Sequence, residues 1–462
     1  MLRRSWLRLV CVLVLATIVG TACGSSSRGN DAGSNTTTTA GDTAATSTKF
    51  GDLDSPCGKG DAKGATEQGV TDTAITIAYG DDAGFTNSPG LNHEMADAIK
   101  GMVKWCNDQG GINGRTVDAK YYDAKITEVA NVMTEACASA FMLVGEGWSL
   151  DSIGEQKRVE CGLSAVPGFA VSPGLAHGPG MVQAVPNPVD FTPVQIAASI
   201  AKAFPDKVAK TAVMYANYPA TIDTKDKVLG SYPDFGFKFL PCPQEYNIQG
   251  ESDWKPFANK LKACGAEVVY FTGSPYPNFE NFLEAANQLD YHPIYITDAN
   301  FYDQAFAKWN KDGLADNVYV REAFPPLDAA DKIPAIKDYL DIVQGNGGDV
   351  NQLGEQSASS FLLWATAAKA CGSDLTRACM AKELAKVTEW TGGGLHAKTN
   401  PASNKPPECG LVLKLEGTKY VQFDPKTVGD LDCSPDYVKQ VTGAVVDNAK
   451  LGPDRVSTLF TK

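Results

Sequence analysis

The stretch WCNDQGGINGRTVDAKYYD, residues 105–123, decides the fold, because it fixes the order of a helix, a glycine turn and a strand. Residues 92–108 carry apolar side chains at helical spacing, and residues 115–123 have the composition of a strand. Glycine loops that bind phosphate have the opposite order, since the helix N-terminus after them supplies amide donors. Gly110 or Gly111 is therefore expected to close the helix in the left-handed conformation. The stretch predicts a chain reversal and no ligand site.

Strands and helices alternate along most of the chain that follows residue 70. The predicted strands are residues 74–80, 115–123, 140–145, 162–166, 211–216, 238–243, 267–273 and 293–298. The predicted helices between them are residues 92–108, 128–139, 152–160, 192–204, 221–230, 253–264 and 278–290. Such alternation indicates βαβ units, and its length favours two doubly wound α/β domains with parallel sheets.

The order of the elements changes after residue 298. Residues 317–327 indicate a strand that leads into a proline-marked crossing, and three helices are predicted next. The last predicted element is a hairpin whose turn has the sequence EGTK. These helices and the hairpin cover residues 335–344, 358–371, 375–387 and 410–423.

The helix, glycine turn and strand of residues 105–123 resemble the first part of type I periplasmic binding proteins, in the branch of the leucine/isoleucine/valine-binding proteins. The resemblance extends in element order over residues 70–424. It implies two α/β lobes with doubly wound parallel sheets, joined by three hinge crossings, with a small ligand closed between the lobes. The implied parts are residues 70–187 and 327–390 for the first lobe, 188–326 and 391–440 for the second, and an unexplained C-terminal tail, 441–462.

Residues 1–22 have the pattern of an export signal, with a basic start, a short apolar run and small residues before Cys23. The apolar run, residues 9–19, is shorter than the roughly 20 residues that span a bilayer. Small residues directly before a cysteine resemble a bacterial lipobox, which implies an exported lipoprotein of the actinobacterial type with its lipid on Cys23. An ordinary cleaved signal is the alternative. The pair Arg3 and Arg4 leaves both the general and the twin-arginine export routes open.

The residues after Cys23 predict a tether between the lipid anchor and the folded part. Residues 24–49 contain no large apolar side chain, so residues 23–50 are expected to be disordered. This arrangement places the protein outside the cytoplasm, attached to the cell membrane by its lipid.

Twelve cysteines are present, and ten of them follow the predicted signal and Cys23. An even number in an exported chain indicates disulfide bonds. Zinc sites are disfavoured because the chain has only four histidines and no Cys-x-x-Cys motif, so no metal site is expected. Pairing cannot be deduced from sequence, and the predicted pairs are the local ones, Cys371–Cys379, Cys242–Cys264 and Cys409–Cys433.

The candidate ligand-binding residues follow the predicted strands, because open α/β sheets bind ligands beyond the carboxyl ends of their strands. In the first lobe these loops have the sequences DDAGFTNSPG, EGWSLDS and PGFAVS, and in the second lobe NYPAT, SPYP and DANFYD. The predicted site residues are Phe85, Trp148, Ser149, Gly168, Phe169, Val171, Tyr218, Tyr276, Asp298 and Asn300.

The resemblance also implies two polar seats for an amino-acid ligand. Its carboxylate would meet hydroxyls and backbone amides at the loops of Ser149 and Val171, and its ammonium would meet Asp298. Trp148 can stack on a flat ligand or a cation, which leaves ligands other than branched-chain amino acids open. Structural interpretations stay open as well, since Trp148 and Phe169 can be core residues and Ser149 can cap a helix.

The function expected from these observations is non-enzymatic binding. The net charge is −13, which excludes the basic footprint of a nucleic-acid-binding protein. The chain has no G-x-S-x-G, Walker A or H-E-x-x-H motif, and no cofactor is expected. The resemblance implies an extracytoplasmic lipoprotein that delivers a small solute to the membrane permease of an ABC-type transporter. The alternatives are a ligand-sensing lipoprotein that signals to a membrane receptor and an exported α/β hydrolase.

Overall fold

The computed structural model describes residues 49–462, so the predicted signal, Cys23 and nearly all of the predicted tether lie outside the described residues. Lys49 and Phe50, the last residues assigned to the tether, pair as β1 (Lys49–Phe50) with β2 (Leu53–Asp54). Phe50 is fully buried and contacts Trp105 edge to face. Ordered structure therefore begins before residue 51, because this apolar side chain belongs to the core.

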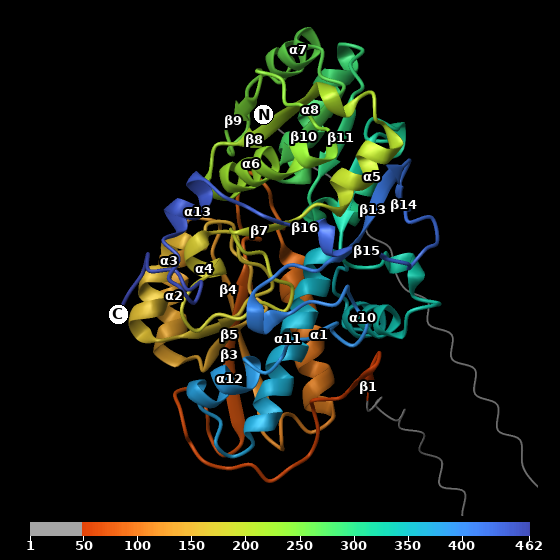
Figure 1. The fold of residues 1–462 in the computed structure, drawn as a ribbon. Helices are drawn as coiled ribbons and strands as arrows, with labels where there is room; N and C mark the ends of the chain where they lie inside the picture. The colour runs from red at the N-terminus through yellow and green to blue at the C-terminus, as the bar shows by residue number, and fades with distance from the viewer. Residues whose placement is uncertain (1–48) are drawn as a thin grey trace, which may run out of the picture. The chain divides into compact units, whose positions relative to one another are not determined.

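The first sheet has four parallel strands in the order β4-β3-β5-β6, and Figure 1 labels β3, β4 and β5 of this sheet. Alternate residues of β3 face opposite sides, with Ile75 and Ile77 in one core and Ala78 in another. The first core includes α1, α10, α11 and α12, and the second includes α2 and α3. The bounds are β3 (Ala74–Asp81), β4 (Thr116–Asp123), β5 (Met142–Val144), β6 (Ser164–Val166), α1 (His93–Asp108), α2 (Val129–Ser139), α3 (Ser152–Cys161), α10 (Pro334–Gly345), α11 (Gln352–Cys371) and α12 (Arg377–Leu384).

The second sheet runs in the order β14-β13-β12-β11-β10-β8-β9, with β15 paired to β13. The pairs from β9 to β12 are parallel, and the hairpin of β13 and β14 adds antiparallel strands at one edge. The strands are β8 (Thr211–Ala216), β9 (Gln244–Tyr246), β10 (Val268–Thr272), β11 (Ile294–Thr297), β12 (Val318–Glu322), β13 (Cys409–Glu416), β14 (Lys419–Asp424) and β15 (Asp432–Cys433).

Helices cover both faces of the second sheet. One core contains Ile196 of α5 (Gln195–Ala203) and Val228 of α6 (Pro219–Ser231). The other core contains residues of α7 (Lys255–Cys264), α8 (Glu280–Gln288) and α9 (Gln304–Trp309). The two sheets with helices on both faces confirm the predicted α/β class.

The strand predicted at residues 238–243 was wrong. The strand of this region is β9, which begins directly after the predicted end, and within residues 238–243 Phe239 makes an isolated bridge to Thr211. Pro241 and Pro243 have no amide hydrogen to donate, so the ladder that Phe239 and Leu240 begin cannot continue to residue 243.

The glycine turn of residues 109–115 is structural, as its element order predicts. Gly110 and Gly111 follow α1 with φ of 110° and 74°, and the Gly111 amide donates to the Cys106 carbonyl at 3.0 Å. The buried Arg115 side chain donates to the carbonyls of Gly372 and Gly64, each at 3.0 Å. The turn therefore joins α1 to β4 and ties distant loops of the first lobe together.

The ten cysteines after Cys23 form five disulfide bonds. The three predicted pairs, Cys371–Cys379, Cys242–Cys264 and Cys409–Cys433, are all present. The remaining two bonds are Cys57–Cys106 and Cys137–Cys161. The Cys57–Cys106 bond fastens the segment before β3 to α1.

The chain crosses between the lobes after β6, after β12 and before β13. The C-terminal segment, residues 438–462, then follows the same boundary. Its strand β16 (Val438–Gln440) pairs with β7 (Phe191–Pro193) of the first crossing. Its helix α13 (Ala444–Ala449) contacts α6 of the second lobe and α4 (Pro173–Ala176) of the first lobe. The segment therefore touches both lobes, which the resemblance did not explain.

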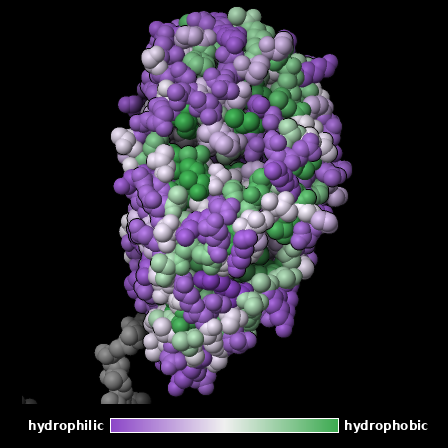
Figure 2. Space-filling view, turned by 90° about the vertical axis from the view of Figure 1, so that its left-hand side faces the viewer, coloured by the Kyte–Doolittle hydropathy of each residue, from purple (hydrophilic) through white to green (hydrophobic). Residues whose placement is uncertain are grey.

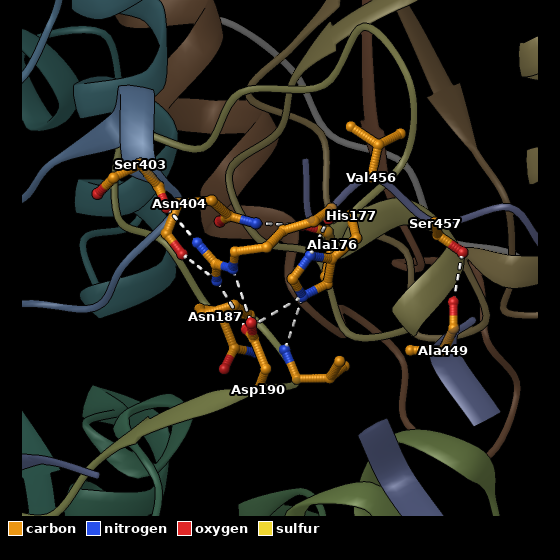
Figure 3. A network of polar contacts seen from close by, with 12 residues as sticks. Ala176, His177, Asn187, Asp190, Ser403, Asn404, Ala449, Val456 and Ser457 are labelled. Atoms are coloured by element: carbon orange, nitrogen blue, oxygen red, sulfur yellow. Dashed lines mark hydrogen bonds and ion pairs between the residues drawn. The ribbon is translucent and has the colours of Figure 1, made fainter. Parts of the chain in front are cut away.

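Arg455 of the C-terminal segment holds the first and third crossings together, at Asp190 and at Ser403 and Asn404, which Figure 3 labels. Its guanidinium binds both carboxylate oxygens of Asp190 at 2.7 Å and also donates to the carbonyls of Ser403 and Asn404. Beside it, the buried His177 contacts the Arg455 carbonyl through Nδ1 and accepts the Val189 amide through Nε2. Burial lowers the pKa of His177, which favours the neutral imidazole in this network.

Figure 2 shows one face of the folded part, on which hydrophilic side chains predominate and hydrophobic ones form small groups. Among residues 49–462, no helix is long and apolar enough to cross a membrane.

Candidate functional site

A cavity of about 300 Å³ lies between the lobes, at the carboxyl ends of strands from both sheets. Loops after β3 and β6 line it from the first lobe, and loops after β8, β10 and β11 line it from the second. Residues of the crossings, including Asn187 and Pro406, complete the wall. Small-molecule sites are expected at this position in α/β folds, and the volume lies at the lower end of their usual range.

The lobes meet around the cavity through direct hydrogen bonds. Asn87 of the first lobe donates to the Gln249 carbonyl at 3.3 Å, and Ser88 donates to the Tyr276 carbonyl at 3.4 Å. At another point Asn351, next to α11, donates to Asp303 of the second lobe at 3.1 Å. These contacts describe a closed arrangement in which a ligand is covered from both sides.

Eight of the ten predicted site residues line this cavity. They are Phe85, Ser149, Phe169, Val171, Tyr218, Tyr276, Asp298 and Asn300.

Trp148 and Gly168 do not line the cavity. Trp148 is 1% exposed and packs with Val129 and Leu143 in the core under α2 and α3. A β-carbon at Gly168 would lie 2.5 Å from the Met95 methyl group, so close packing explains this glycine. The structural interpretation of Trp148 therefore holds, and no stacking on a ligand follows from it.

The backbone amides predicted to bind an anion in the first lobe already have carboxylate partners. Asp82 accepts the amides of Ser149 and Ile126, each at 2.7 Å. Asp151 accepts the amides of Val171 and Ser172 at 2.8 and 3.2 Å. Burial raises the pKa of Asp82 to about 6 and that of Asp151 to about 7. These internal bonds brace the two loops and leave the four amides occupied.

Asp298, the predicted seat for an ammonium group, is also engaged. Its Oδ1 accepts the Tyr270 hydroxyl at 2.8 Å and the Arg321 guanidinium at 3.3 Å. Arg321 itself lines the cavity from the end of β12. In the wall of the second lobe, Asp298 therefore forms an ion pair with Arg321 and also accepts a hydrogen bond from Tyr270. Asp298 thus already has a cation as its partner.

Lys227 and Arg321 are the basic residues among those that line the cavity. Lys227 lies on α6 and is 8% exposed, and its ammonium donates to the Pro188 carbonyl at 2.7 Å and to Asn187 Oδ1 at 3.4 Å. Burial lowers the pKa of Lys227 to about 8. Asp223, Asp298 and Asp190 act against that decrease, and Arg321 adds to it.

Sequence reasoning missed several cavity residues. Arg321 and Glu322 end a strand that is otherwise apolar, and such a charged pair at the carboxyl end of a buried strand is a usable signal. Lys227 had no comparable signal, because the helix segment DTKDK contains two lysines and two aspartates at similar positions. Gln352 and Gln356 of α11 also line the cavity, and they belong to a helical turn that the sequence analysis left outside its predicted helix.

Among residues 49–462, no group of three or more His, Cys, Asp or Glu side chains is arranged to hold a metal ion. The polar groups of the cavity are a few side chains from helices, a strand end and loops of both lobes, which suits recognition of a small organic molecule.

A model of the periplasmic binding protein family matches residues 75–419. The chain belongs to the periplasmic binding protein family. This match and the structural neighbours confirm the type I fold and the resemblance to leucine/isoleucine/valine-binding proteins. Membership makes the protein a solute-binding protein and not an enzyme. A search among curated protein sequences found no match.

Solved structures similar to this periplasmic binding protein include three with informative descriptions. A fatty acid ABC transporter substrate-binding protein from Thermomonospora curvata has a TM-score of 0.68 and 15% identity, covering 82% of this chain and 97% of its own. The branched-chain amino acid transporter substrate binding protein LivJ from Streptococcus pneumoniae, in complex with isoleucine, has a TM-score of 0.60 and 16% identity, covering 76% and 100%. A solute binding protein from R. palustris, in complex with 4-hydroxybenzoate, has a TM-score of 0.63 and 14% identity, covering 79% and 98%. The TM-scores establish a shared fold.

Proposed function

We propose that the protein is the extracytoplasmic substrate-binding component of an ABC-type transporter, anchored to the membrane by a lipid on Cys23. The observation that supports this most directly is the cavity of about 300 Å³ between the lobes of a periplasmic binding protein. The neighbouring structures described above belong to transporter proteins for fatty acids, branched-chain amino acids and 4-hydroxybenzoate, which suggests amino acids and small organic acids as the solutes to test.

The mechanism proposed is hinge closure. Without ligand, the lobes open at their crossings and expose the cavity walls to solvent. A solute that contacts both walls favours the closed form, because it binds that form more tightly than the open one. The interlobe bonds of Asn87, Ser88 and Asn351 add to the closed form only. Closure then presents a ligand-dependent surface to a membrane permease.

A thermal-shift screen tests this function. The mature protein is heated with single amino acids, amides, fatty acids and aromatic acids, and a bound solute raises the unfolding temperature because it binds only the folded state. A solute present at about 100 times its dissociation constant raises the free energy of unfolding by about 2.7 kcal/mol. Small-angle scattering of the same samples should show a smaller radius of gyration with the active solute. The proposal fails if no solute stabilises the protein or if a stabilising solute is chemically converted.

The lipid anchor has a separate test. Cys23→Ala removes the thiol that would carry the lipid, so the full-length variant should leave the membrane fraction and appear in the soluble extracytoplasmic fraction. Cys11→Ala, a substitution inside the predicted signal, is the matched control and should leave the protein at the membrane. A Cys23→Ala protein that stays in the membrane fraction contradicts lipid anchoring and leaves solute binding untouched.

A further inference from the structure

Of the two basic residues that line the cavity, Arg321 has a carboxylate partner, whereas Lys227 donates its hydrogen bonds to neutral oxygens. Lys227 and Arg321 bring two cations, and Asp298 supplies a carboxylate that contacts Arg321 at 3.3 Å. The other acidic lining residue, Glu322, is 1% exposed, and burial raises its pKa well above the usual range, which favours its neutral form. A buried cation is costly unless it is paired, so the closed cavity favours a ligand with a negative charge.

Both sites expected to bind a zwitterionic amino acid, one for its carboxylate and one for its ammonium group, are already occupied by contacts within the protein. The amides of Ser149 and Val171, which would bind its carboxylate, donate to Asp82 and Asp151. Asp298, which would bind its ammonium, contacts Arg321. An additional ammonium at Asp298 would lie beside the guanidinium and be repelled by it.

We propose that the ligand is a small organic carboxylate without an ammonium group, and that Lys227 and Arg321 of the second lobe hold its carboxylate. The proposal rests on the function proposed above and names the substrate class of that same cavity. Arg321 offers a planar fork of donors that matches a carboxylate, and Lys227 offers a second charged donor from another element. The anionic end of the ligand is thereby assigned to the lobe opposite the one that the family resemblance implies.

The rest of the cavity describes the body of this ligand. Apolar side chains of Phe85, Phe169 and Ile126 face it from the first lobe, and Ile248 faces it from the second. Buried amide oxygens of Gln352 and Gln356 on α11 have no hydrogen-bond partner within residues 49–462. Unpaired polar groups in a closed site favour a ligand that satisfies them. A hydroxyl group on an otherwise apolar body would meet this requirement.

Pairs of ligands that differ in a single group test the proposed carboxylate site at Lys227 and Arg321 in the unaltered protein. Calorimetry compares phenylacetate with phenylacetamide, hexanoate with hexanamide, and 4-hydroxyphenylacetate with phenylacetate, and includes leucine as the zwitterion. Each amide keeps the shape of its acid and removes the charge. We expect at least one carboxylate to bind, its amide to bind at least about tenfold more weakly, leucine to give no measurable binding, and the hydroxyl to improve affinity.

Variants locate the anionic end of the ligand. Lys227→Met and Arg321→Met should each weaken carboxylate binding at least about tenfold, and Lys227→Arg should restore part of it. Lys225→Met is the matched control, because Lys225 lies on the same helix, pairs with Asp226 and does not line the cavity. Ser149→Ala probes the alternative carboxylate site in the first lobe, where the Ser149 amide donates to Asp82. Circular dichroism and unfolding midpoints verify that each variant is folded.

The pH dependence of carboxylate affinity distinguishes a lysine that binds the ligand from one that only stabilises the fold, because only the first would change this dependence. Because the pKa of Lys227 is about 8 without ligand, carboxylate affinity should be constant below pH 7 and fall as the pH rises through 8. Asp223 on the same helix, Asp190 in the first crossing, Asp298 after β11 and Arg321 on β12 are the charged groups that act on Lys227. Lys227→Arg should remove the decrease.

The outcomes separate this proposal from the function on which it rests. Equal affinity for an acid and its amide, or leucine binding that Ser149→Ala abolishes, overturns the carboxylate seat while solute binding stands. The seat is also overturned if none of the carboxylates binds. The transporter function falls only if the wider solute screen gives no ligand as well.

Discussion

At Gly111 the backbone leaves no room for a side chain. A β-carbon there would lie 1.9 Å from the Arg115 carbonyl oxygen, and the residue has φ of 74°. Gly111→Ala should therefore lower the free energy of unfolding by about 1 kcal/mol or more. The backbone conformation is strained for alanine, and the added methyl group would clash with a backbone atom. Chemical denaturation measures the change, and ligand affinity per folded molecule should stay the same.

Gly230→Ala is the control for this prediction. Gly230 lies inside α6, and a β-carbon there has no neighbour within 4 Å. Alanine in a helix interior is favoured over glycine by roughly 0.5–1 kcal/mol, so this variant should be neutral or more stable. An unchanged stability of Gly111→Ala would show that the turn relaxes. A large loss of ligand affinity would instead assign the turn to the binding site.

Single positions in the binding loops were harder to interpret from sequence than the glycine turn. Strand ends predict which loops face the cavity, and Phe85, Tyr218 and Asp298 lie where that rule puts them. The rule does not say whether a side chain points outward, so Trp148 was assigned to the cavity although its indole is in the core. It also cannot show that Asp82 reaches the amide of Ser149, 67 positions away.

At the scale of elements, periodicity predicted most helices and strands because each lobe buries alternate or helically spaced apolar residues. Prediction failed where an element depends on a distant partner. β9 forms by pairing with β8, and its sequence QEY is too short and polar to give a pattern. β1 forms only because Phe50 enters the core of the first lobe.

One of the two disulfide bonds that were not predicted depends on a contact between distant parts of the chain, and the other could have been predicted from the sequence. The Cys57–Cys106 bond joins residues 49 positions apart, and only the folded first lobe brings them together. Cys137 and Cys161, in contrast, lie near the ends of α2 and α3, which contact each other. Consecutive helices on one face of a parallel sheet run in the same direction, so their last turns lie side by side. That argument would have predicted the pair.

At the scale of the whole folded part, the C-terminal segment adds a connection between the lobes. β16 extends the first crossing, and α13 contacts a helix of each lobe. Any opening motion about the crossings must carry this segment along or detach it. The tail had no sequence pattern that revealed this role, since its helix has six residues and its strand has three.

Arg455 allows this connection to be tested with one substitution. Arg455→Ala removes the paired hydrogen bonds to Asp190 and the bonds to the carbonyls of Ser403 and Asn404, and it leaves a carboxylate that is 11% exposed without its cation. We expect the free energy of unfolding to fall by about 2 kcal/mol, the usual range for hydrogen bonds to charged groups. The ligand-free protein should also show a larger radius of gyration in small-angle scattering, because the first and third crossings are no longer joined.

Lys450→Ala is the matched control for Arg455, since Lys450 is an exposed basic residue of the same segment. It should change neither stability nor scattering. Arg455→Lys keeps the charge but cannot bind both oxygens of Asp190 in a planar fork, so it should recover only part of the lost stability. If Arg455→Ala unfolds with unchanged free energy, the crossings are held by the pairing of β7 and β16 alone. If stability falls while the radius of gyration stays constant, the contacts of Arg455 stabilise the fold without restricting the opening of the lobes.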